Sequence, residues 1–434
     1  MTVPGLRPVL RAGWPDALKR GFLAFVVMAG LGQVLALGVW ALAGTGRSFG
    51  AFARIGWLYV GAFHHVALEL EGPVAIGASR AEAGRFSVGV AFLAATGLAL
   101  WLLFRAARAV ADRAGGGTAG RILHGAMVAP AYAVPPFALA LLVTARVHVD
   151  SALLVADLRA SLDPWQALTF PFALAALAGA AGGFRSALDA RPSELRLAGA
   201  AWEGGWRMFG LGLALAYGGL FVAGVVQPDE PVALLTPSSA RYHQEAFARP
   251  KVGALILAHH VGLAPNEAVW TLVPAMGGCD AFRGGERIDF LCYRRFPRGI
   301  RLLPPGTFPL VDLGNIGFGS APAGYLSFLV VPAAASALGG RLAAARVGTK
   351  GREALLAGAL AGAVFAALVS LAAILSVVTV RSEVTGRLVG TVLLGPDLVT
   401  GPLLALAWGV LGGAAGAASS GATAWWRRSG SRPR

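Results

Sequence analysis

Eight long apolar stretches constrain this chain more than any other feature. Each has few or no charged residues, and they lie at about 21–43, 88–104, 122–145, 165–183, 207–226, 322–340, 354–379 and 402–424. Because about 20 apolar residues in a helix cross the hydrocarbon core of a bilayer, each stretch predicts a transmembrane helix. Of the 434 residues, 56% are hydrophobic and 14% are charged, which excludes an ordinary water-soluble protein. The predicted fold class is all-α, a polytopic transmembrane helix bundle with about eight full spans.

Basic residues between the apolar stretches predict the orientation. Four Lys or Arg residues occur in each of five segments, which are 1–20, 105–121, 184–207, 341–353 and 425–434. Short loops rich in Lys and Arg stay in the cytoplasm. The strong excess of Arg over Lys, with abundant Ala and Gly, is typical of a high-GC bacterial genome and not of nucleic-acid binding. We therefore expect a protein of the bacterial plasma membrane with both termini cytoplasmic and no nucleic-acid partner.

Two weaker apolar segments, 55–68 and 252–276, each contain a His-His pair, and Pro265-Asn266-Glu267 interrupts the second. If the second segment crossed the membrane and 303–320 did not cross back, the basic segments that follow would move outside, against the orientation rule. We expect both segments to be re-entrant or interfacial helices at the outer face, shielded by protein. In an alternative reading, each segment forms a hairpin of two full spans.

The two His-His segments also suggest an internal repeat. His64-His65-Val66-Ala67-Leu68 and His259-His260-Val261-Gly262-Leu263 share His-His-Val-x-Leu, in a chain with seven His residues. Each string follows the first span of a four-span set, which predicts parallel repeats at 1–196 and 197–434, the second with an exported loop at 277–310. Parallel repeats related by an axis along the membrane normal occur in secondary transporters. A duplication that built only a symmetric bundle explains the pattern equally well.

Small residues at helical spacing predict close packing between the spans. Glycines four residues apart let helix backbones approach in a membrane. Such pairs occur at Gly179 and Gly183, Gly358 and Gly362, Gly409 and Gly413, and Gly412 and Gly416.

The histidine pairs and nearby carboxylates form the candidate polar or metal site. The residues are His64, His65, His259, His260, Glu69 and Glu267. Imidazole binds zinc, copper or haem iron and titrates near neutral pH. Adjacent residues on a helix point about 100° apart, so one pair needs help from the other pair or from Glu69, expected one helical turn from His65. The alternative, which we favour, is that these are structural or interfacial histidines and that the chain has no cofactor.

The two cysteines, Cys279 and Cys292, both fall in the predicted exported loop. The exported space of bacteria permits disulfides, so we expect a structural bridge, with two separate thiols as the alternative.

Two short strings carry a family resemblance. They are Gly13-Trp14-Pro15-Asp16-Ala17-Leu18 before the first span and Ala264-Pro265-Asn266-Glu267-Ala268-Val269-Trp270 in the second His-His segment. The chain resembles uncharacterised actinobacterial multi-pass membrane proteins of the streptophobe type. The resemblance implies a similar multi-pass architecture and no particular activity.

Two functions from different classes fit these features. One is a permease or channel-like protein for a small solute or ion, with its site between the two halves. The other is a non-catalytic membrane scaffold or envelope-assembly partner that binds another membrane protein. No activated nucleophile or catalytic base is visible, so an enzyme is the weakest hypothesis.

Overall fold

A computed structural model describes residues 6–43, 49–76, 82–150, 154–226, 250–284, 286–298, 301–302, 311–312, 317–348, 351–385 and 387–429. The chain divides into two compact units. Unit 1 is Met1–Arg191 together with Val378–Leu393, and unit 2 is Pro192–Val377 together with Leu394–Arg434.

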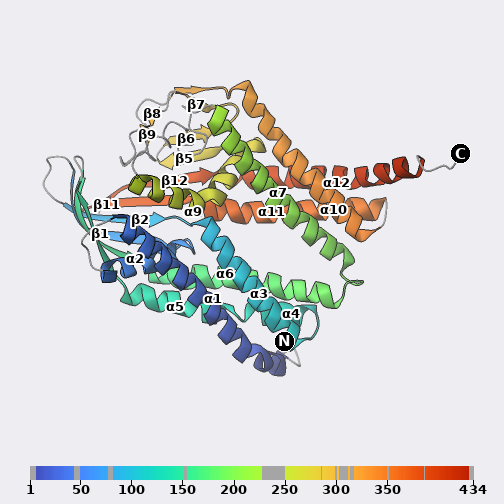
Figure 1. Cartoon of the computed structure of the whole chain (residues 1–434), viewed down its shortest axis with the longest axis horizontal. Coiled ribbons are helices and arrows are strands. Elements are labelled where there is room, and N and C mark those ends of the chain that lie inside the picture. The colour runs from blue at the N-terminus through green and yellow to red at the C-terminus, as the bar shows by residue number, and fades with distance from the viewer. Residues whose placement is uncertain are drawn as a thin grey trace. The chain divides into compact units, whose positions relative to one another are not determined.

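Unit 1 is a helix bundle with strands at one end (Figure 1). Its elements are α1 (Leu6–Ala43), α2 (Phe49–Ala62), β1 (Leu68–Ile76), β2 (Glu82–Gly89), α3 (Leu93–Ala114), α4 (Thr118–Ala126), α5 (Ala129–Leu142), β3 (Ala145–Asp150), β4 (Leu154–Leu162), α6 (Pro164–Ala190), β11 (Val378–Val384) and most of β12 (Arg387–Pro396). The strands follow the order β3-β4-β1-β2-β11-β12. The pairings of β1 with β2 and β4, of β2 with β11 and of β3 with β4 are antiparallel.

Unit 2 has the same kind of construction. Its elements are α7 (Arg196–Val226), α9 (Pro250–Ala275), β5 (Asp280–Gly284), β6 (Glu286–Leu291), β7 (Phe296–Arg298), β8 (Arg301–Leu302), β9 (Val311–Asp312), β10 (Gly317–Gly319), the 3₁₀ helix η1 (Ala323–Leu329), α10 (Val330–Val347), α11 (Arg352–Ser376) and α12 (Thr400–Ser429). Strands β5 and β6 form an antiparallel hairpin, and β7 pairs with β10 and β8 with β9.

Eight helical segments of the described chain are long and apolar enough to cross a membrane. They are Gly13–Ala41, Leu93–Ala114, Thr118–Leu142, Pro164–Ala190, Arg196–Ala223, Ala323–Val347, Arg352–Ser376 and Thr400–Ser419. Each overlaps one of the eight stretches predicted from the sequence. The prediction of eight apolar helices long enough to span a membrane is therefore confirmed for the described residues. The third segment is interrupted between α4 and α5, where Pro130 at the start of α5 has no N–H to continue the helical hydrogen bonds.

The expectation of an all-α fold is wrong, because the connections at one end of the helices pair as β-strands. In β1, Leu70 and Val74 pack with Phe86 and Leu158 on one face of the sheet. Glu69 alternates with these residues and faces Ser87 on the other side. Alternation with a period of two is the signal of a half-exposed strand. It is present in Leu68-Glu69-Leu70-Glu71, where apolar length and composition alone do not reveal a strand.

Glycines set the distance between helices in both units. A Cβ on Gly179 of α6 would lie 2.5 Å from the carbonyl oxygen of Gly125 in α4, so only glycine permits this crossing. In unit 2, Gly358 of α11 and Gly413 of α12 meet in the same way. The α6 glycine Gly182 also rests on the backbone of α3 at Phe104. These contacts confirm that the predicted small-residue motifs are packing positions.

Each unit gathers its basic segments at the helix ends away from the strands. In unit 1, Arg113 of α3 pairs with Asp16 of α1 at 2.8 Å, and Arg108 of α3 pairs with Asp189 of α6 at 2.8 Å. Segments 1–20 and 105–121, and the part of 184–207 up to Arg191, therefore lie together in unit 1. In unit 2, Arg196 at the start of α7 pairs with Glu353 of α11.

Candidate functional site

His64, the first of the candidate site residues, lies just beyond α2 in unit 1 and is 1% exposed. Its Nδ1 lies 2.7 Å from the carbonyl oxygen of Val60, and its Nε2 lies 2.6 Å from the hydroxyl of Tyr132 in α5. A carbonyl oxygen only accepts, so Nδ1 carries the hydrogen, and Nε2 accepts from the Tyr132 hydroxyl. Burial lowers the pKa of His64 to about 4, against a smaller opposing effect of the Val60 hydrogen bond. The neutral His64 ring links α2 to α5 through these two hydrogen bonds, so neither nitrogen is free for a metal.

His65 and Glu69 do not lie on one helix, so the expected spacing of one helical turn is wrong. His65 has φ +60° and ends the turn after α2, while Glu69 lies in β1. The Glu69 carboxylate accepts a 2.6 Å hydrogen bond from Ser87 and lies 3.5 Å from the Arg85 guanidinium. Glu69 therefore belongs to a polar face of the sheet.

His259 and His260 lie inside α9, which continues to Ala275, and their side chains fall outside the described part of the structure. Whether the two histidine pairs lie close together therefore falls outside the described structure. Over the described residues, no three His, Cys, Asp or Glu side chains are arranged to hold a metal ion.

Glu267 lies in a buried polar stretch of α9 in unit 2. Asn266 is fully buried, Glu267 is 2% exposed and Thr271 is 7% exposed. Helix α9 packs mainly on α7 and α11, and Glu267 interacts electrostatically with Tyr217 of α7. One turn further along α9, Trp270 donates a 3.2 Å hydrogen bond to the carbonyl oxygen of Ser376, the last residue of α11. The segment of α9 that contains the buried Glu267 therefore packs beside the end of α11.

Beyond α9, the cysteines clamp the first hairpin of unit 2. Cys279 and Cys292 form a disulfide with their Cα atoms 4.8 Å apart, one before β5 and the other after β6. The backbone oxygen of Cys279 accepts a 2.9 Å hydrogen bond from the N–H of Asp397. The hairpin is thus tied to the residues that lead into α12.

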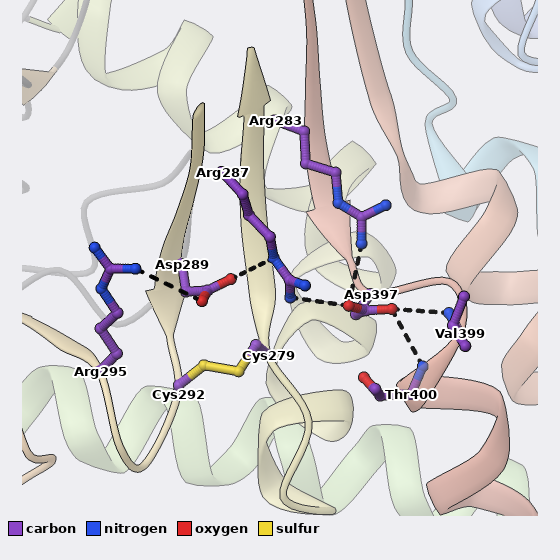
Figure 2. A network of polar contacts seen from close by, with 9 residues as sticks. All are labelled: Cys279, Arg283, Arg287, Asp289, Cys292, Arg295, Asp397, Val399 and Thr400. Atoms are coloured by element: carbon purple, nitrogen blue, oxygen red, sulfur yellow. Dashed lines mark hydrogen bonds and ion pairs between the residues drawn. A yellow bond between two sulfur atoms is a disulfide. The ribbon is translucent and has the colours of Figure 1, made fainter. Parts of the chain in front are cut away.

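Asp397 is the centre of the polar network shown in Figure 2. Its carboxylate accepts hydrogen bonds from the N–H groups of Val399 (2.8 Å) and Thr400 (3.1 Å), which caps the start of α12. It also pairs with Arg283 at 3.1 Å and Arg287 at 2.9 Å. Burial alone would raise the pKa of Asp397, but these hydrogen bonds and charges outweigh burial and lower it. Arg287 also contacts Asp289, which continues the network to Arg295.

Asp280, next to the disulfide, stands apart from this network. It is fully buried, and neither carboxylate oxygen has a hydrogen-bond partner in the described structure. Burial raises the pKa of Asp280 well above its usual value. Its partner across the hairpin is Leu291, and residues directly opposite each other in an antiparallel pair project on the same face.

Leu291 lines a pocket of about 30 Å³ at the strand end of unit 2. Its walls include five aromatic residues from α9, the chain after β6, β7 and η1: Trp270, Tyr293, Phe296, Tyr325 and Phe328. Tyr325 lies 4.7 Å from Phe296 and 5.8 Å from Phe328 between ring centroids. Burial raises the pKa of the Tyr293 phenol to about 12.

Of the predicted site residues, the structure makes His64 structural, places Glu69 on the sheet and buries Glu267. It adds Asp280, Asp397 and the aromatic pocket, which the sequence did not single out. Asp397 had a usable signal, because an Asp shortly before an apolar helical run is typical of an N-cap. No family model, curated protein or solved structure matches the chain.

Proposed function

We propose that this chain is a permease-type protein of the bacterial plasma membrane in which Glu267 binds and releases a proton or a small cation. The burial of Glu267 beside apolar helices carries the proposal. An ionisable group inside a membrane protein is costly, and such groups typically mark ion or proton pathways. Asn266 and Thr271 are buried polar residues on α9 next to Glu267, and the Thr271 hydroxyl donates a 2.8 Å hydrogen bond to the backbone oxygen of Glu267.

The position of Glu267 suits an entrance at the exported side. Tyr217 lies near the C-terminal end of the helical segment Arg196–Ala223, and Trp270 bonds to the end of Arg352–Ser376. We take these helix ends as exported, because the basic segments lie at the opposite ends. In this arrangement α2 and α9 are re-entrant helices that enter and leave at the exported face.

Similar turns after α2 and α9 support the same proposal, because they favour an internal duplication. After α2, the N–H of Val66 bonds to Gly61, His65 has a positive φ, and Ala67 accepts from the N–H of Asp163, which caps α6. After α9, the N–H of Gly278 bonds to Val273, Gly277 has a positive φ, and Cys279 accepts from the N–H of Asp397, which caps α12.

The glycine contacts correspond as well. The pair Gly125 and Gly179 matches Gly358 and Gly413, and Gly182 on the backbone of Phe104 matches Gly416 on that of Ala337. These correspondences favour two parallel repeats that meet near residues 191–196. Some secondary transporters are built from such parallel repeats. The correspondences pair His65 with Gly277, so the two His-His strings do not mark equivalent positions.

Reconstitution tests the permease proposal. Purified protein is placed in liposomes, a potassium gradient with valinomycin sets an inside-negative potential, and entrapped pyranine reports proton entry while ²²Na⁺ uptake reports sodium. We expect one of the two fluxes to exceed that of protein-free liposomes and to fall to that level in Glu267→Gln. The control Glu383→Gln, on the β11 strand of unit 1 where Glu383 pairs with Arg381, should retain the flux. Equal fluxes with and without protein, or an unchanged flux in Glu267→Gln, would overturn the proposal.

One observation favours the second candidate, a non-catalytic envelope scaffold. The disulfide and the Asp397 network fix the β5–β6 hairpin to α12, which is the construction of a rigid exported platform. Stoichiometric co-purification of another membrane protein, combined with no flux above background, would support this role instead.

A further inference from the structure

We propose that the exposed face of α3 in unit 1 binds an anionic membrane lipid, with Arg105 as the ligand of the lipid phosphate and Trp101 beside it. The site belongs to unit 1 and does not depend on the proposed role of Glu267 in unit 2.

Helix α3 has one buried face and one exposed face. Leu103 is among the residues of its buried face. The other face carries Leu98, which is 37% exposed, Trp101, which is 50% exposed, and the exposed Arg105. Residues three or four positions apart lie on the same side of a helix. Because the segment Leu93–Ala114 is long and apolar enough to cross a membrane, we expect this exposed face to contact lipid.

Arg105 differs from the other arginines of α3 in having no carboxylate partner. Arg108 and Arg113 pair with aspartates of α6 and α1, each at 2.8 Å. Among the residues that the structure describes, Arg105 makes no ion pair. An Arg side chain stays charged in proteins, and a charge beside the apolar part of a membrane is costly unless it is paired. Arg105 therefore needs an anion from outside the chain.

Trp101 holds the guanidinium of Arg105 in place without using its hydrogen-bond donors. The central carbon of the guanidinium lies 5.0 Å from the centroid of the Trp101 ring, which is within the range of a cation–π contact. The N–H donors of Arg lie in the plane of the guanidinium and match two oxygens of a phosphate. A stacked Arg105 can therefore still bind a phosphate at its edge. Trp is also typical of the level of the lipid head groups.

The position of Arg105 along α3 suits a lipid phosphate. It precedes Arg108 by three residues, and Arg108 belongs to the ion pairs at the basic end of unit 1. Arg105 is thus the basic residue of α3 that lies nearest the middle of the span. A long Arg side chain can extend from such a position to the head-group level, where lipid phosphates are the available anions.

The charge of this end of unit 1 favours an anionic lipid over a zwitterionic one. The segments 1–20, 105–121 and 184–191 together contain ten basic and three acidic residues. Such an excess attracts lipids with a net negative charge, at about 1 kcal/mol for each basic residue near the surface. The ammonium group of a zwitterionic lipid is repelled by the same residues.

Native mass spectrometry of the purified full chain, titrated with lipid in detergent, tests the site. The probes are dioleoylphosphatidylglycerol, which is anionic, and dioleoylphosphatidylcholine, which is zwitterionic. For the first bound lipid, we expect an affinity for phosphatidylglycerol about fivefold above that for phosphatidylcholine. Arg105→Gln should weaken the binding of phosphatidylglycerol about fivefold, and Trp101→Leu should weaken it about two- to fivefold. Arg105→Lys, which keeps the charge, should retain most of the preference.

The matched control is Arg113→Gln, which removes the same charge from the same helix at a residue already paired with Asp16. It should bind phosphatidylglycerol as the unmodified protein does. Equal losses in Arg105→Gln and Arg113→Gln would show that only net charge matters and would overturn the site. Equal affinity of the unmodified protein for the two lipids would overturn it as well.

A soluble phosphate distinguishes a lipid from a free anion. The probe sn-glycerol 3-phosphate carries a phosphate without acyl chains, so it should not displace phosphatidylglycerol when added at the same concentration. Displacement that Arg105→Gln abolishes would identify a site for a free anion and would overturn the assignment to a lipid.

Discussion

At the residue scale, both nitrogens of His64 are used inside unit 1, one by Val60 and the other by Tyr132. Asp397 is likewise bound on every side, by two backbone N–H groups and two arginines. Asp280 is the contrasting case, since it is buried and lacks hydrogen-bond partners in the described structure. Because these environments differ, we expect substitutions of the three residues to change the free energy of unfolding differently.

The pair of His64 and Tyr132 should behave as a coupled unit. Tyr132→Phe leaves Nε2 of His64 buried without its donor, which should lower the free energy of unfolding by about 1–3 kcal/mol. His64→Leu should be destabilising in the same way. In the double variant both polar groups are gone, so its loss should be smaller than the sum of the single losses. Reversible SDS titration in mixed micelles measures the four free energies, and strictly additive losses would contradict the link.

The two aspartates of unit 2 should have opposite pH dependence. The pKa of Asp397 is lowered by folding, so its contribution is present above the unfolded value of about 3.9 and is lost as the pH falls through the folded pKa. The pKa of Asp280 is raised, so stability decreases as the pH rises from about 3.9 through its folded pKa.

Thermal unfolding across about pH 2–8 checks both signs. Asp397→Asn should lower stability by about 1–3 kcal/mol near neutral pH and by less in acid. Asp280→Asn should be more stable than the unmodified protein near neutral pH, and the difference should shrink in acid. The same pH dependence for both variants would contradict the assigned environments.

At the element scale, the transmembrane helices were predictable and the strands were not. Runs such as 354–379 need only apolar composition and length to be recognised, and α11 covers Arg352–Ser376. The β11 strand pairs with β2, far away in the sequence, and such pairing depends on tertiary context. The site follows the same rule: Glu267 was visible as a carboxylate in an apolar segment. Asp280 became notable only when the fold enclosed it and brought the aromatic residues of η1 close to α9.

Helix packing gives a prediction at this scale. Gly179→Ala places a Cβ against the carbonyl oxygen of Gly125, which should destabilise unit 1 by about 1–3 kcal/mol. The control Gly97→Ala adds a methyl group in α3 where no atom lies within 4 Å. It should be neutral or raise stability by about 0.5–1 kcal/mol through helix propensity. Equal effects of the two substitutions on the SDS unfolding midpoint would contradict the close crossing.

The β5–β6 hairpin gives a second prediction. Because we place it in the oxidising exported space, Cys279 and Cys292 should be linked in cells. Proteolysis of membranes without reductant, followed by mass spectrometry, should recover one peptide pair joined through these residues. Recovery of two alkylated thiols would argue that the hairpin faces the cytoplasm.

At the scale of the whole molecule, each unit has basic residues at one end of its helices and strands at the other. The ion pairs of Arg113 with Asp16 and of Arg196 with Glu353 gather the basic segments within their units. The hairpins and the aromatic pocket occur at the strand-bearing ends. The proposed function of Glu267 requires those ends to face the exported side.

The most direct test of this arrangement is single-cysteine labelling in a Cys279→Ser, Cys292→Ser background. Glu82→Cys lies in an exposed part of β2, Ala190→Cys at the end of α6 and Ala345→Cys near the end of α10. In intact cells, a membrane-impermeant maleimide should label Glu82→Cys alone, and the other two should react only after permeabilisation. Labelling of Ala345→Cys or Ala190→Cys in intact cells, or protection of Glu82→Cys, would contradict eight spans with exported strands.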